Sequence, residues 1–111
     1  MQRIQKLLES LGAGRNYVGF YQTARAVLLI LEDESRLGAV TKNVFEVIAK
    51  EYGCSRQAVE RNIRTVIRRV WLMNPHFLSS ISRYPLTTAP TIVEFLDILS
   101  LYLLYSDSSA S

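Results

Sequence analysis

The feature of the sequence that most constrains its fold is a long amphipathic stretch in the middle of the chain, residues 56–73. Its apolar side chains recur every three or four positions, the period of an α-helix with one buried face, and they are Val59, Ile63, Val66, Ile67, Val70 and Trp71. Ser55 precedes the stretch and is a residue type that caps the first turn of a helix. Pro75 disfavours the helical conformation at the residue before it, so we expect the helix to end near Asn74.

The same period predicts helices on the N-terminal side of this stretch. We expect a short helix over residues 4–11, ended by the glycines at 12 and 14, and a second over 17–32 followed by an exposed acidic turn. A third helix should begin at a Thr41 cap and end at Gly53. The side chains expected to be buried on the second and third helices are Phe20, Tyr21, Ala24, Val27, Leu28, Leu31, Val44, Phe45, Ile48, Ala49 and Tyr52.

The C-terminal part alternates helix breakers with helix signals. A short helix is expected over residues 76–81, and residues 84–90 contain two prolines and no period, which indicates an ordered loop. Thr91 and Glu94 have the spacing of a capping box, so a final helix should follow over residues 92–105. No segment alternates apolar and polar residues as a strand does. We therefore predict an all-α fold, a compact bundle of about six helices.

Length and composition are those of one globular domain. The chain has 111 residues, 49% of them hydrophobic, enough to bury a single core. We assign residues 1–105 to one domain and residues 106–111 to a disordered tail. One cysteine and one histidine supply neither an internal disulfide nor a zinc site, and His76 has no triad partners, so we expect no metal, cofactor, small-molecule substrate or enzymatic activity. Neither a secretory signal nor a membrane span is recognisable, and we expect a cytoplasmic protein without a membrane role.

Residues 49–59 have the spacing of a helix-turn-helix. This motif needs a small residue where two helices cross, a glycine with positive φ in the turn, and a branched apolar residue that holds the second helix in place. Ala49, Gly53 and Val59 supply these residue types at offsets of four and ten. The bundle is therefore predicted to contain a helix-turn-helix whose second helix covers residues 56–73.

Positive charge is concentrated on that second helix. Residues 56–69 hold five arginines and one acid, a local charge of +4 in a chain whose net charge is +3. The outward face offers arginine for guanine, glutamine for adenine and a carboxylate for cytosine, and a protein that binds only phosphates has no use for the carboxylate. We expect Gln57, Glu60 and Arg61 to read bases. The phosphate candidates are Lys42, Arg64 and Arg68, and the full candidate set for DNA binding is Lys42, Arg56, Gln57, Glu60, Arg61, Arg64, Thr65 and Arg68.

Four segments resemble one known family. Residues 59–64, continued by Ile67 and Trp71, are similar to the recognition helix of the sporulation-initiation response regulators, the family of stage zero sporulation protein A. Residues 37–42, 48–50, and 90–91 followed by 94–95, agree in the same order. The resemblance covers roughly residues 7–104. It implies a six-helix effector domain from a spore-forming type of bacterium, a transcription factor that binds double-stranded DNA at tandem sites, with contacts between neighbouring copies through the last helix.

The resemblance also bears on single residues. Glu60, Arg61 and Arg64 match family positions that meet the DNA, whereas Ala58 stands where the family's base-reading set has an arginine, so the family's target sequence does not transfer to this chain. The family joins this domain to a phosphoacceptor receiver, and this sequence contains none. An excised piece of a longer regulator and a free-standing effector are both compatible with that.

Two alternatives to DNA binding are kept open. The arginine-rich face is compatible with an ordinary solvated helix surface, and the chain is compatible with a receiver-less interaction module that pairs with a full-length regulator and modulates it. The last helix motivates the second alternative: Phe95, Ile98, Leu99, Tyr102 and Leu103 should serve the core, while Leu96, Leu101, Leu104 and Tyr105 should leave apolar surface for a homodimer or tandem contact through residues 92–105. Trp71 and Cys54 are expected to be packing residues.

Overall fold

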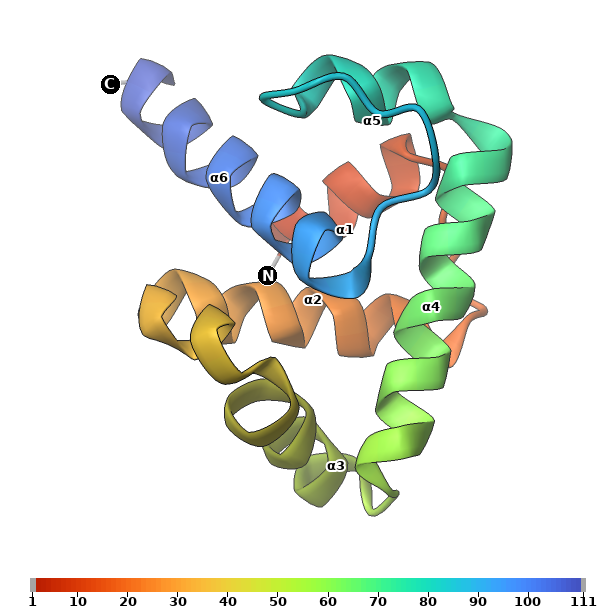
Figure 1. Cartoon of the computed structure of the whole chain (residues 1–111), viewed down its shortest axis with the longest axis vertical. Coiled ribbons are helices and arrows are strands. Elements are labelled where there is room, and N and C mark those ends of the chain that lie inside the picture. Colours follow the sequence, from red (N-terminus) through yellow and green to blue (C-terminus); the bar gives the residue numbers. More distant parts are fainter. Residues whose placement is uncertain (1, 111) are drawn as a thin grey trace.

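The apolar periodicity of the sequence corresponds to helices in the computed structural model, which describes the backbone of residues 2–110 and the side chains of residues 3–106 (Figure 1). The α-helices are α1 (Gln2–Ser10), α2 (Val18–Glu32), α3 (Glu46–Tyr52), α4 (Arg56–Met73), α5 (Pro75–Ile81) and α6 (Ile92–Ala110). A 3-10 helix, η1 (Glu34–Ala39), and a π-helical turn, η2 (Thr41–Phe45), precede α3. No described residue lies in a strand, and the predicted all-α bundle is confirmed.

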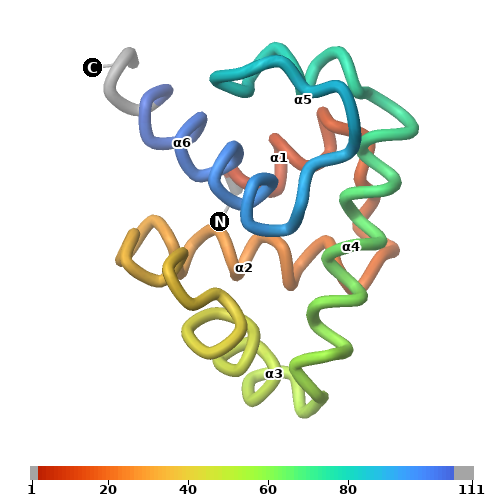
Figure 2. The backbone as a smooth tube through the Cα atoms, viewed as in Figure 1, coloured from red at the N-terminus to blue at the C-terminus, as the bar shows by residue number. Residues whose placement is uncertain are grey.

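Helix α2 lies at the centre of the bundle. It packs against α1, α3, α4 and α6, while α4 stands along one side of the molecule with α3 at its N-terminal end (Figure 2). Because neighbours surround α2, its buried residues are not confined to one stripe: Ala26, Leu29 and Ile30 are buried as well as the predicted Phe20, Ala24 and Val27. The predicted burial of Tyr21 is wrong, since that side chain is 37% exposed, and Leu28 and Leu31 are only half-buried.

The start of the third helical region differs from the prediction. Thr41 is no N-cap, because Val40 before it already has helical dihedral angles and the chain passes from η1 through η2 into α3. The cap lies further upstream, at Asp33, whose carboxylate accepts hydrogen bonds from the Ser35 backbone N–H (3.1 Å) and hydroxyl (2.6 Å). The expected acidic turn is therefore the beginning of a helical segment.

Helix α6 begins as predicted. The Thr91 backbone N–H donates to Glu94 Oε1 (2.8 Å) and the Glu94 N–H donates to Thr91 Oγ1 (3.2 Å), which is the reciprocal bonding of a capping box. Leu96 is fully buried, contrary to the expectation that it adds to an apolar surface, because α1, α2, α4 and α5 all contact α6. Tyr102 is half-buried.

The C-terminal end of α6 departs from the predicted helix end at residue 105. Its backbone is helical to Ala110. The predicted disordered tail, residues 106–111, falls mostly on residues whose side chains lie outside the described part of the structure, and it stays a prediction. None of the helices among the described residues combines the length and the hydropathy of a membrane-spanning segment.

Candidate nucleic-acid interface

The turn between α3 and α4 has the geometry that a helix-turn-helix requires. Gly53 adopts left-handed dihedral angles (φ 65°, ψ 38°). The backbone N–H groups of Gly53 and Cys54 both donate hydrogen bonds to the Ala49 carbonyl oxygen, and the bond from Cys54 is 3.0 Å long. Ser55 is extended, and its hydroxyl accepts a hydrogen bond from the Ala58 N–H at 3.1 Å, so the predicted cap of α4 is confirmed. Ala49 and Val59 are buried where the two helices meet. The chain therefore enters α4 in a fixed direction.

Two residues of the turn are more exposed than the sequence indicates. Tyr52 is 45% exposed and Cys54 is also exposed, so the expected burial of both is wrong. The left-handed backbone at Gly53 reverses the chain between them and leaves both beside solvent. The remaining desolvation of Tyr52 still raises the pKa of its hydroxyl.

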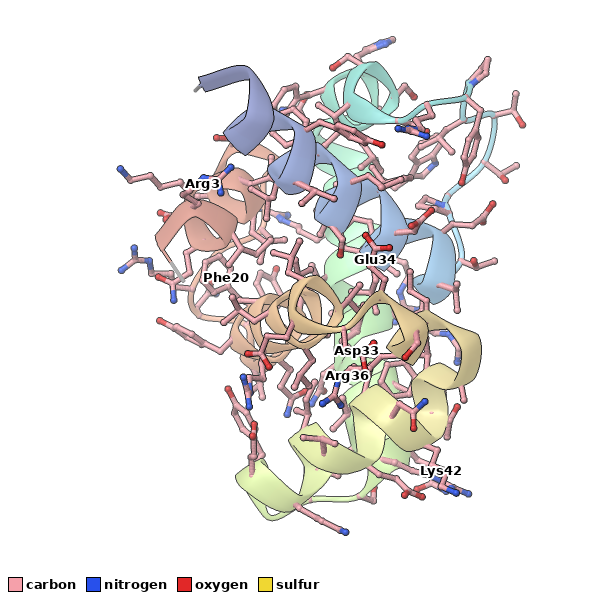
Figure 3. All side chains as sticks on the ribbon, turned by 90° about the vertical axis from the view of Figure 1, so that its left-hand side faces the viewer. Arg3, Phe20, Asp33, Glu34, Arg36 and Lys42 are labelled. Carbon is pink, nitrogen blue, oxygen red and sulfur yellow. The ribbon has the colours of Figure 1, made fainter. Side chains whose placement is uncertain are left out.

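The two faces of α4 separate as the helical period predicts. Val59, Ile63, Val66, Ile67 and Val70 are buried, and Trp71 is half-buried against the core. Six candidate DNA-binding residues of α4 lie on the other side: Gln57, Arg61, Arg64 and Arg68 are exposed, and Glu60 and Thr65 are half-buried. Arg56 is exposed in the first turn but lies in line with the buried Ile63 and Ile67. Lys42 comes from η2, which packs against α4, and its side chain projects away from the bundle (Figure 3).

Short-range contacts hold several of these side chains in the free protein. Arg56 pairs with Glu46 of α3 at 3.0 Å, and Arg64 pairs with Glu60 one turn earlier at 2.7 Å. The Thr65 hydroxyl donates to the Arg61 carbonyl oxygen (3.0 Å) and accepts from Arg68 at 3.5 Å. Exposed ion pairs of this kind contribute only about 0–1 kcal/mol each. A phosphate group can therefore replace the carboxylate partner of either arginine at little cost.

The structure adds contacts between α2 and the helix-turn-helix that sequence reasoning missed. Arg25 of α2 makes a two-pronged ion pair with Glu51 of α3 (2.9 and 2.8 Å), and this hydrogen bonding raises the pKa of Arg25 and lowers that of Glu51. Gln22 is 1% exposed and bonds to α4. The residues around Gln22 on α2 are mostly apolar, and this is the sequence signal that could have predicted its burial.

Beside the outward face of α4 lies a hollow of about 250 Å³. It is lined by Arg64, Ile67 and Arg68 from α4 and by residues 89–92, which lead into α6. Among the residues whose side chains are described, no group of three or more histidines, cysteines and carboxylates is arranged to hold a metal ion. The outward face of α4 carries arginines, one amide (Gln57), one hydroxyl (Thr65) and one carboxylate (Glu60).

A comparison with protein families agrees with this geometry. The model of the family described as "Sporulation initiation factor Spo0A C terminal" matches residues 4–103, which is nearly the whole chain and includes the helix-turn-helix, the outward face of α4 and the hollow. Domains of that family are DNA-binding effector domains and not an enzyme family.

Proposed function

Because this chain belongs to the family of the Spo0A C-terminal domain, a family of DNA-binding effector domains, we propose that it is a sequence-specific transcription regulator that inserts α4 into the major groove of a DNA duplex. The observation that carries the proposal is the outward face of α4. It begins directly after a turn of helix-turn-helix geometry and presents arginines, a glutamine and a glutamate over its first three turns.

The two ends of this face have different tasks in the proposal. Gln57, Glu60 and Arg61 lie near the start of α4, where a recognition helix reaches base edges, and they are the proposed base readers. Arg64 and Arg68 lie further along α4, and Lys42 lies on the neighbouring η2, so these three are the proposed phosphate contacts.

The ion pair between Glu60 and Arg64 links the two tasks. At 2.7 Å the pair orients the Glu60 carboxylate in the free protein. When Arg64 turns to a phosphate, the carboxylate becomes available to accept a hydrogen bond from a cytosine amino group. Glu60 then contributes to sequence discrimination, while Arg64 contributes to affinity for any duplex.

Site selection from a random duplex library at two salt concentrations tests the proposal. We expect one motif to be enriched and its binding to weaken steeply as salt rises, because bound arginines and lysines release counterions. Arg15→Ala is a matched control for Arg64→Ala, since both arginines are about equally exposed (59% and 61%) and both pair with a glutamate, but Arg15 lies between α1 and α2 and is not a candidate DNA-binding residue. Retention of no duplex, or retention without any sequence preference, would contradict the proposal.

A second proposed property is self-association on adjacent sites through α6. Val93, Leu104 and Tyr105 of α6 are 45%, 41% and 52% exposed, and exposed apolar side chains can serve a contact between copies. Size-exclusion chromatography with light scattering, with and without a duplex of two sites, should give a dimer that Leu104→Lys disrupts. A dimer or captured regulator that forms while all duplexes are ignored would favour the interaction-module alternative instead.

A further inference from the structure

Helix α2 crosses α4 at very short range. A Cβ atom built on Gly19 would clash with the backbone carbonyl oxygen of Asn62 and lie 2.8 Å from Val66 Cγ2. The absence of a side chain at this glycine therefore allows the backbones of the two helices to approach each other. Because Asn62 belongs to α4, this crossing lies directly behind the proposed DNA-reading face.

A buried amide bridges the helices next to this crossing. Gln22, one turn after Gly19 on α2, is 1% exposed, and its Oε1 accepts a hydrogen bond of 3.0 Å from Asn62 Nδ2. Its Nε2 group donates a long contact of 4.0 Å to the sulfur of Cys54 in the turn. One side chain of α2 thus touches both the start of the turn into α4 and the middle of α4.

The hydrogen bond adds a directional restraint to the apolar packing of the two helices. Val59, Ile63 and Val66 are buried against the core and hold α4 beside α2, but the hydrophobic effect that drives their burial is itself non-directional. Asn62 is half-buried, at the edge of the buried stripe, where such a rotation moves it sideways. A hydrogen bond tolerates only a narrow range of distance and angle.

The size of that rotation matters for base reading. The outer surface of a helix lies about 6 Å from its axis, so a rotation of about 10° moves a surface atom by about 1 Å. Binding constellations need their groups within about 0.5 Å of the productive geometry. A rotation of this size is therefore large enough to misalign the side chains that face the bases.

We propose that Gln22, acting through Asn62, is a positioning residue that fixes the rotation of α4 about its axis and thereby sets which base edges Gln57, Glu60 and Arg61 reach. The proposal rests on the proposed DNA-binding function. It assigns a role in specificity to a side chain that is itself shielded from the duplex.

The test compares three proteins with the wild type. Gln22→Met keeps the length of the side chain and removes both hydrogen bonds. The exchange Gln22→Asn with Asn62→Gln keeps one amide on each helix and the same total reach. Thr23→Val is the matched control, because Thr23 is the adjacent residue of α2, is equally buried, and its hydroxyl has no partner among the described residues.

Two measurements are made on each protein. The first is the ratio of dissociation constants for the selected site and for the same site with one base pair changed, at two salt concentrations. The second is a set of residual dipolar couplings of the backbone amides of α2 and α4 without DNA, which reports the orientation of one helix relative to the other.

We expect Gln22→Met to lower the discrimination ratio about fivefold with an unchanged salt slope, because the phosphate contacts are kept. We also expect it to alter the couplings of α4 relative to α2. The exchange variant should recover most of both, and Thr23→Val should change neither. If Gln22 only stabilised the fold, Gln22→Met would lower the melting temperature but leave the discrimination ratio and the couplings as in the wild type. That result would overturn the inference.

The two hypotheses fail separately. If the wild type shows no discrimination at all, the proposed function is wrong, and the couplings still decide whether Gln22 positions α4. If the wild type discriminates and Gln22→Met discriminates equally well, the positioning role is wrong and the proposed function stands.

Discussion

Substituting Gly19 by alanine is the sharpest stability test of this fold. The added methyl group would clash with the carbonyl oxygen of Asn62 and lie 2.8 Å from both the Asn62 carbonyl carbon and Val66 Cγ2, whereas carbon atoms in contact are normally about 3.5–4.0 Å apart. The Asn62 carbonyl belongs to the backbone of α4 and cannot rotate away as a flexible side chain would. Helices α2 and α4 must therefore move apart by about 1 Å.

Two opposing effects set the size of the change. Alanine is a better helix former than glycine by at most about 1 kcal/mol, and less near a helix start such as this one. Overpacking costs about 1–3 kcal/mol, and the upper end applies here because backbone atoms are involved. We expect Gly19→Ala to lower the free energy of unfolding by about 2 kcal/mol, which is roughly 8 °C in Tm for a domain of this size.

Urea denaturation followed by circular dichroism measures this change, with Gly38→Ala as the control. No atom lies within 4 Å of a Cβ built on Gly38, so that variant should be at least as stable as the wild type. The two glycines then differ mainly in their surroundings. If Gly19→Ala matches the wild type or exceeds it in stability, helix propensity alone governs the position and the close crossing of α2 and α4 does not exist.

Further predictions concern the interface and its support. Arg64→Ala should weaken binding to all duplexes and reduce the slope of log K against log salt by about one unit. Glu60→Ala should instead reduce discrimination at one base position by about 1–3 kcal/mol. Site selection and salt titration of both variants would refute this division of roles if the selected sites and salt slopes of the two variants changed alike. Gly53→Ala should lower the free energy of unfolding by about 1 kcal/mol because of the positive φ alone, since no atom lies within 4 Å of the added Cβ. Gly53→Asn should cost less. Equal stability of the wild type and both variants in thermal melts would argue against the left-handed turn. Glu51→Gln should cost roughly 0.5 kcal/mol at neutral pH through loss of the pair with Arg25. Because folding lowers the pKa of Glu51, the pair with Arg25 stabilises the fold fully above the ordinary carboxyl pKa near 4.5 and loses its effect as the pH falls through the lower folded pKa. The melting temperatures of the wild type and Glu51→Gln should therefore converge in acid. A difference that stays constant with pH would contradict this assignment.

The helices and the turn of the proposed interface were predictable because their signals are local. The 3.6-residue period identified the buried stripe of α4 from Val59 to Val70, the cap at Ser55 follows from its position before the first turn, and the positive φ of Gly53 reflects a preference of glycine itself. The outward position of Arg61, Arg64 and the other candidate residues followed from the same period. How these side chains contact DNA stays a prediction.

The positions of the helices and the charged face of α4 are therefore encoded locally, since both depend on residues a few positions apart. The burial of Leu96, the exposure of Tyr52 and Cys54, and the bond between Gln22 and Asn62 instead result from how the helices pack. Gln22 and Asn62 are 40 residues apart in the chain. The physical reason is that burial and long-range hydrogen bonds depend on which neighbours the packed helices bring together, and a periodic pattern within one helix carries no information about those neighbours.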